Sequence, residues 1–105
     1  MPTPEARVKD LVKRRMAETW PKSYRFCPVQ NGMGMPGLDF FYCIPHGIWV
    51  AIEAKAPGKE PTPRQELTLK EISAAGGLCY VVDGVASLEE AITDILDVCD
   101  HQCLS

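Results

Sequence analysis

The sequence contains no long hydrophobic run. Its apolar stretches are short and are interrupted by proline, glycine or charged residues, whereas a membrane-spanning helix needs about 20 apolar residues. The first ten residues carry four charged side chains in place of the apolar core of a secretion signal. These absences predict a soluble protein of the cytoplasm that has no membrane partner.

Cysteine pairs of the Cys-x-x-Cys type are also absent. The five cysteines are an odd number, and in a chain without a secretion signal we expect them to be reduced. Cys99 and Cys103 are spaced for one helix face with His101 between them. This spacing leaves open a soft-metal site or an ordinary C-terminal tail, and no second ligand pair favours the site.

The length leaves room for one small core. A chain of 105 residues buries only about 60 to 70% of its extended surface, in a core of two layers. We therefore expect a single domain over residues 1–105 without a separate cofactor domain. This excludes Rossmann dehydrogenases and eight-stranded α/β barrels.

Charged residues of both signs are present, but they are distributed unevenly. The net charge of −3 argues against a nucleic-acid binder that works by bulk positive charge. Residues 1–25 hold seven basic and three acidic side chains, a net +4, whereas residues 83–105 hold six acidic and no basic ones, a net −6. Only the N-terminal part is therefore suited to face phosphates, although an ordinary solvated helix face has the same charge pattern.

Hydrophobic periodicity predicts an α/β fold with the element order α-β-β-β-α-β-α. The helices are expected to follow the capping residues Thr3, Thr62 and Ser87. The last strand is continuously apolar and follows a helix, so we expect it to be central and parallel to a neighbour. In chain order we expect helix 4–19, edge strand 24–29, a glycine-rich loop 31–37, strands 38–44 and 48–55, helix 63–75, strand 78–82 and helix 88–96.

Residues 45–47 predict a three-residue hairpin loop that sets the register of the two strands it joins. If Ile44 pairs with Ile48, Asp39 lies directly opposite Glu53, with Cβ atoms about 5 Å apart. Alternation places Lys55 on the same face. Like charges in opposite positions are destabilising unless a positive charge lies between them, and a hard divalent cation with oxygen ligands meets that need.

The same residues also allow a purely structural interpretation. Carboxylates at strand ends can turn into water, and Glu53 can form an ion pair with Lys55. A register shifted by one residue would place Asp39 against Ile52 or Ala54 and separate the two carboxylates. In favour of a site, Glu53 and Lys55 end an apolar run and precede a loop, a position at which ligand sites are commonly built.

The order of these motifs resembles the PD-(D/E)xK nuclease superfamily and, within it, the virus-type replication-repair nuclease (VRR-NUC) domain. The motifs are Gly37-Leu38-Asp39, Glu53-Ala54-Lys55, Thr62-Pro63-Arg64-Gln65 and Ala75-Gly76-Gly77 before an apolar strand. The resemblance runs from Glu5 to about Asp83, with two residues between Pro36 and Asp39 where the superfamily has Pro-Asp. It implies a restriction-endonuclease-like αβββαβ core with a mixed sheet, to which the C-terminal helix is an addition.

The resemblance also implies a site for Mg²⁺ or Mn²⁺. Asp39 and Glu53 would bind the ion together with the backbone carbonyl of Ala54. Glu5 is a further candidate ligand, although the helix dipole alone favours an acid in a first helical turn. Lys55 would orient the attacking water and offset charge on the scissile phosphate.

Gln65 and several basic side chains complete the expected site. Gln65 matches a glutamine that the family carries at a helix start, so the resemblance adds it to the catalytic set of Asp39, Glu53 and Lys55, but a capping box alone also explains it. The side chains expected to contact DNA are Lys9, Lys13, Arg14 and Arg64.

Other side chains with reactive or stacking chemistry are expected to have ordinary roles. His46 and His101 have no nucleophile partner in the sequence, so Ser-His or Cys-His catalysis is unsupported. Four aromatic side chains could stack on bases, but core or strand positions explain them better than such a role does. They are Trp20, Tyr24, Phe26 and Trp49.

Together these features favour a metal-dependent endonuclease. The resemblance implies hydrolysis of phosphodiester bonds in duplex or branched, Holliday-junction-like DNA by a homodimer, in DNA repair in a bacterial or phage-infected cell. Recognition of shape or backbone is expected, since the chain has no room for a sequence-reading module. The alternatives are a non-catalytic nucleic-acid-binding module of the same fold and a metal-dependent RNA hydrolase. The presence of Asp39, Glu53 and Lys55 favours catalysis over binding alone.

Overall fold

The computed structural model describes residues 2–28 and 38–104, the last three of these as backbone only. The predicted element order is confirmed. The helices and strands are α1 (Pro4–Thr19), β1 (Tyr24–Phe26), β2 (Phe40–Ile44), β3 (Ile48–Ala54), α2 (Pro63–Ala74), β4 (Leu78–Val82) and α3 (Val85–Leu104). The predicted loop 31–37 and the end of the predicted strand 24–29 lie outside the described residues.

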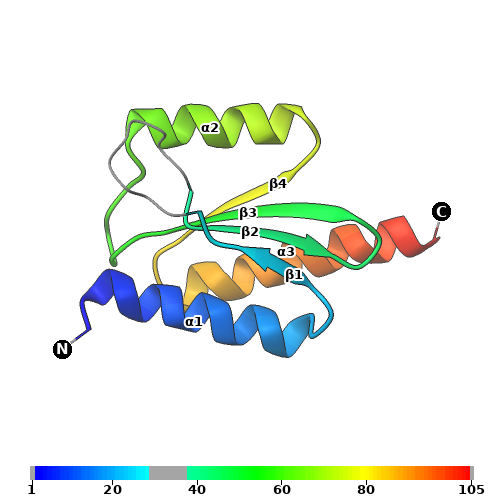
Figure 1. The fold of residues 1–105 in the computed structure, drawn as a ribbon, viewed down its shortest axis with the longest axis horizontal. Coiled ribbons are helices and arrows are strands. Elements are labelled where there is room, and N and C mark those ends of the chain that lie inside the picture. Colours follow the sequence, from blue (N-terminus) through cyan, green and yellow to red (C-terminus); the bar gives the residue numbers. More distant parts are fainter. Residues whose placement is uncertain (1, 29–37, 105) are drawn as a thin grey trace.

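The four strands form one mixed sheet in the order β1-β2-β3-β4, antiparallel between the first three and parallel between β3 and β4. Figure 1 shows α1 and α3 on one side of this sheet and α2 on the other. Strand residues that face α1 and α3, such as Tyr42, Val50 and Ile52, are buried with the inner faces of those helices. The mixed α/β sheet inferred from the sequence is therefore confirmed.

Helix α1 begins where its capping signals predict. The Thr3 hydroxyl accepts a hydrogen bond from the backbone N–H of Ala6 at 3.1 Å, and Pro4 occupies the first helical position, where its missing N–H costs nothing. Val8, Val12 and Met16 recur at helical spacing and are buried. This spacing turns the apolar stripe of α1 toward the sheet and leaves its charged residues on the other sides of the helix.

Two features of the C-terminal half differ from the expectation. β4 is an edge strand and not the central strand that was expected. It is apolar because α2 and α3 cover it, and not because strands lie on both sides of it. α3 begins at Val85, so Ser87 is not a capping residue; its hydroxyl binds Asp83 and the Gly84 carbonyl instead. α3 also extends well beyond residue 96. No helix among the described residues is long and apolar enough to cross a membrane.

Candidate active site

The hairpin register brings Asp39 and Glu53 together as predicted. Ile44 pairs with Ile48 and Phe40 with Ile52, so Asp39, one residue before β2, lies opposite Glu53. The backbone N–H of Asp39 donates a 3.1 Å hydrogen bond to Glu53 Oε1. The side chain of Asp39 is 10% exposed and that of Glu53 is 3% exposed, so the carboxylates do not turn into water.

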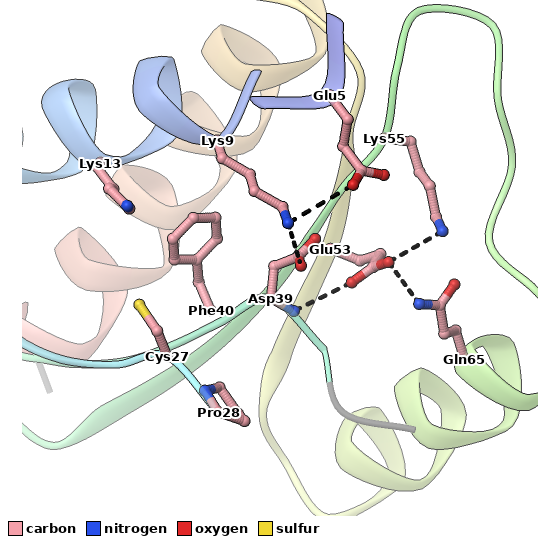
Figure 2. Close-up of a pocket in the computed structure, with 10 residues that line it drawn as sticks. All are labelled: Glu5, Lys9, Lys13, Cys27, Pro28, Asp39, Phe40, Glu53, Lys55 and Gln65. Carbon is pink, nitrogen blue, oxygen red and sulfur yellow. Dashed lines mark hydrogen bonds and ion pairs between the residues drawn. The ribbon is translucent and has the colours of Figure 1, made fainter. Parts of the chain in front are cut away.

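Asp39 is held at the end of β3 by the backbone. The N–H of Ala54 donates a 2.8 Å hydrogen bond to Asp39 Oδ2 and fixes this carboxylate. Figure 2 shows Asp39 beside Glu53. The sequence did not predict this contact. In extended backbone the N–H and C=O of one residue leave the strand on the same side, so the carbonyl of Ala54, expected as a metal ligand, belongs to the same strand edge.

Glu53 is a buried acid surrounded by donors. Burial, and to a lesser extent the nearby Asp39 carboxylate, raise the pKa of its carboxyl to about 7 against the opposing effect of Lys55. The Lys55 ammonium lies 3.2 Å from Glu53 Oε2. The ion pair that the sequence allowed between these two side chains is therefore present, and it places the ammonium inside the same site.

Gln65 connects α2 to Glu53. The backbone N–H of Thr62 donates to Gln65 Oε1, and the backbone N–H of Gln65 donates to the Thr62 hydroxyl, so the predicted capping box is confirmed. With its oxygen held in this way, the Gln65 amide presents Nε2 to Glu53 Oε2, at 2.6 Å. The capping box and the site role expected for this residue are therefore compatible, because the cap orients the amide.

Helix α1 supplies the opposite wall of the site. The Lys9 ammonium lies 3.4 Å from Asp39 Oδ1 and 3.6 Å from Glu5 Oε2. Partial burial lowers the pKa of Lys9, but the two carboxylates outweigh this effect and hold it above its usual value. Figure 2 shows the ammonium between the two acids. Lys9 thus supplies positive charge to Asp39 and Glu5, while Lys55 supplies it to Glu53.

A cavity of about 430 Å³ joins these groups. Its lining includes Glu5, Lys9, Lys13, Asp39, Glu53, Lys55 and Gln65, all expected from the sequence, together with Cys27, Pro28 and Phe40, which were not. Arg14 and Arg64 do not line it; Arg14 pairs with Glu18 at 3.6 Å. His46 and His101 are exposed and lie away from the cavity.

The donor set of the cavity suits a hard divalent cation. Among the described residues, no group of three His, Cys, Asp or Glu side chains is placed to hold a metal alone. Mg²⁺ does not require such a cage, because it usually keeps several waters and binds one or two carboxylates together with substrate phosphates. Asp39 and Glu53 provide that pair. The soft-metal alternative of Cys99 with Cys103 includes a side chain outside the described residues, that of Cys103.

Comparison with solved structures agrees with the motif order. A structure described as a VRR_NUC domain superposes with a TM-score of 0.73 at 21% identity, covering 87% of this chain and 96% of that chain. The chain has the fold of a VRR-NUC domain. No protein-family model and no curated protein matches the sequence. The predicted resemblance is therefore confirmed as a likeness to the VRR-NUC fold.

The raised pKa of Glu53 predicts a pH-dependent stability of the metal-free protein. Between its ordinary value of 4.5 and about 7, the folded state binds the Glu53 proton more tightly than the unfolded state. The free energy of unfolding should therefore fall as pH rises through this window, by on the order of 3 kcal/mol, and stay lower above it. Urea denaturation in EDTA measures this change. Glu53→Gln should lack it, and parallel curves for the two proteins would contradict the assignment.

Proposed function

We propose that the protein is a Mg²⁺- or Mn²⁺-dependent endonuclease that hydrolyses DNA phosphodiester bonds, with branched DNA as its preferred substrate. The observation that carries the proposal is the pairing of Asp39 and Glu53 in a cavity that also contains the ammonium of Lys55. Two carboxylates, a half-buried ammonium and a fixed amide in one cavity match the needs of phosphoryl chemistry.

Asp39 and Glu53, with the carbonyl of Ala54, would hold the ion, and Glu5 is a further candidate ligand. The ion would polarise a phosphoryl oxygen and lower the pKa of a bound water. Lys55 would place a positive charge where negative charge develops on the phosphate and would orient the attacking water. Gln65 keeps Glu53 in position through a 2.6 Å hydrogen bond. Lys9 and Lys13, on the α1 wall of the cavity, would contact neighbouring phosphates, where positive charge contributes affinity without base specificity.

A cleavage assay tests the proposal against a binding-only protein. Linear, nicked, flapped and four-way DNA are incubated with the protein in Mg²⁺, Mn²⁺ or EDTA. We expect cuts in the metal-containing samples, most of them in the branched substrates, and none in EDTA or with Glu53→Ala. Binding without cleavage in both metals would favour the non-catalytic module. A role in DNA repair is a further part of the proposal and rests on the motif resemblance alone.

We also propose that two copies act together. One copy offers one cavity and a narrow basic surface, whereas a two-fold pair would present two cavities at a fixed separation. Light scattering at micromolar concentration, alone and with a four-way junction, should give the mass of two chains. A single-chain mass in both conditions would contradict paired cutting and would leave the chemistry of each site untouched.

A further inference from the structure

Part of the sheet face that carries Asp39 and Glu53 is lined by exposed aromatic side chains. In the register of the strands, Tyr24 lies opposite Cys43 and Cys43 opposite Trp49. In the next row, Phe26 lies opposite Phe41. Tyr24, Phe26 and Trp49 occupy strand positions, one of the two placements expected for them, and are 71%, 53% and 45% exposed. Trp20 is 8% exposed and belongs to the core. We call Tyr24, Phe26, Phe41 and Trp49 the aromatic face.

The aromatic face exists because α2 covers only one side of the sheet surface. α2 packs against β4. Gly77, in the turn that follows α2, lies close to Trp49, since a Cβ added to it would be 3.0 Å from the indole. Among the described residues, β1 and β2 are not among the main packing partners of α2. Phe41 and Trp49 stack with their ring centroids 5.4 Å apart. The stacked pair thus lies on the same face of the sheet as the exposed rings of Tyr24 and Phe26.

The aromatic face leads directly to the candidate active site. Phe41 and Asp39 are two residues apart on one chain segment, so their side chains share a face about 6.6 Å apart. On the neighbouring segment, Cys27 and Pro28 follow Phe26 and line the cavity. A chain of nucleotides with its phosphate at Asp39 and Glu53 would therefore continue onto the rings.

The charges around the aromatic face favour a polyanion over a second copy of this chain. Described residues 19–28 and 40–52 contain no acidic side chain, and Lys22 is exposed just before β1. Lys13 adds a further positive charge in the adjoining cavity. Helix α3, which carries most of the acidic residues of the C-terminal part, lies on the opposite side of the sheet (Figure 1). Aromatic rings interleaved with basic side chains are the usual surface for single-stranded nucleic acid.

We propose that the aromatic face binds the unpaired bases of single-stranded DNA next to the bond that is cut. The proposal rests on the proposed nuclease function and narrows its substrate to DNA with a single-stranded segment beside the scissile phosphate. Bases in a continuous duplex are already stacked on one another and cannot lie on protein rings. The rings would accept any base, since stacking reads no hydrogen-bond pattern.

Binding of a labelled oligothymidylate of about twelve nucleotides tests the proposal without cleavage, because the measurement is made in EDTA. Fluorescence anisotropy compares the wild type with Tyr24→Ala/Phe26→Ala. We expect the double variant to bind at least tenfold more weakly, since base stacking on one ring contributes about 1 to 3 kcal/mol. Leu67→Ala and Val85→Ala, which shorten exposed apolar side chains elsewhere, should bind like the wild type. The conservative variant Tyr24→Phe should do the same.

The remaining outcomes separate this proposal from its competitors. Unchanged affinity of the double variant for the oligonucleotide would overturn it, as would an equal loss for a blunt duplex of the same length. If the double variant instead lowers the mass measured by sedimentation without DNA, the face joins two copies of the chain and the proposal is wrong. Thermal melting confirms that each variant is folded. The proposed hydrolysis can fail in the cleavage assay while this binding result holds, so the two are distinguishable.

Discussion

Asp39→Asn is expected to lower the rate of DNA cleavage by about 10³-fold, because several kcal/mol of stabilisation by the bound ion would be lost. The substitution keeps the shape of the side chain, and the amide oxygen can still accept the hydrogen bond from the Ala54 N–H. Loss of the negative charge removes one of the two carboxylates that would hold the cation. Single-turnover cleavage of a flapped DNA in Mg²⁺ measures the effect.

Asp10→Asn is the matched control for this experiment. Asp10 is an exposed acid on α1, so its replacement makes the same change of charge outside the cavity. Cleavage by Asp10→Asn should stay within about twofold of the wild type, since exposed charges contribute little. A similar loss in both variants would show that net charge, and not the position of Asp39, governs the activity.

Lys55→Met is expected to lower cleavage by about 10²- to 10³-fold, the usual effect of removing one group that stabilises developing negative charge. Methionine keeps most of the buried stem of the side chain and loses the ammonium that lies 3.2 Å from Glu53. Because the ammonium is not a metal ligand, binding of Mn²⁺ measured by calorimetry should persist. The rate and the metal affinity therefore separate, and this separation is the signature of the role proposed for Lys55.

Lys70→Met is the control for Lys55, because Lys70 is an exposed lysine on α2 away from the cavity. It should cleave DNA at the rate of the wild type. Full cleavage by Lys55→Met would show that Lys55 is only an ion-pair partner of Glu53 and does not act on the phosphate. Loss of both Mn²⁺ binding and cleavage would show that Lys55 holds the site together rather than acting on the phosphate.

The central geometry of the site could be predicted from local rules. A hairpin loop of three residues fixes the pairing of Ile44 with Ile48, and strand alternation then determines every partner down to Asp39 and Glu53. The capping box at Thr62 places Gln65 at the start of α2 in the same way. Neighbouring residues set these features, so short stretches of sequence were sufficient.

The features that sequence reasoning missed depend on how distant elements pack. The contact of Lys9 with Asp39 depends on the angle at which α1 crosses the sheet, and the periodicity of the helix sequence does not determine that angle. β4 was expected at the centre because its sequence is continuously apolar. Such a run indicates that both faces of the strand are covered, but it does not give the position of the strand in the sheet. The exposure of Tyr24 and Trp49 follows from the incomplete cover given by α2, which hydrophobicity alone does not reveal.

A crystal structure of the protein soaked in Mn²⁺, with an anomalous map recorded at the manganese absorption edge, tests the proposed metal site most directly. We expect one peak that contacts the carboxylates of both Asp39 and Glu53, with the Lys9 ammonium displaced from Asp39. Soaked crystals of Asp39→Asn should lack the peak. An empty cavity in wild-type crystals, or an ion held without Asp39 and Glu53, would contradict the proposed metal site and the hydrolysis that depends on it.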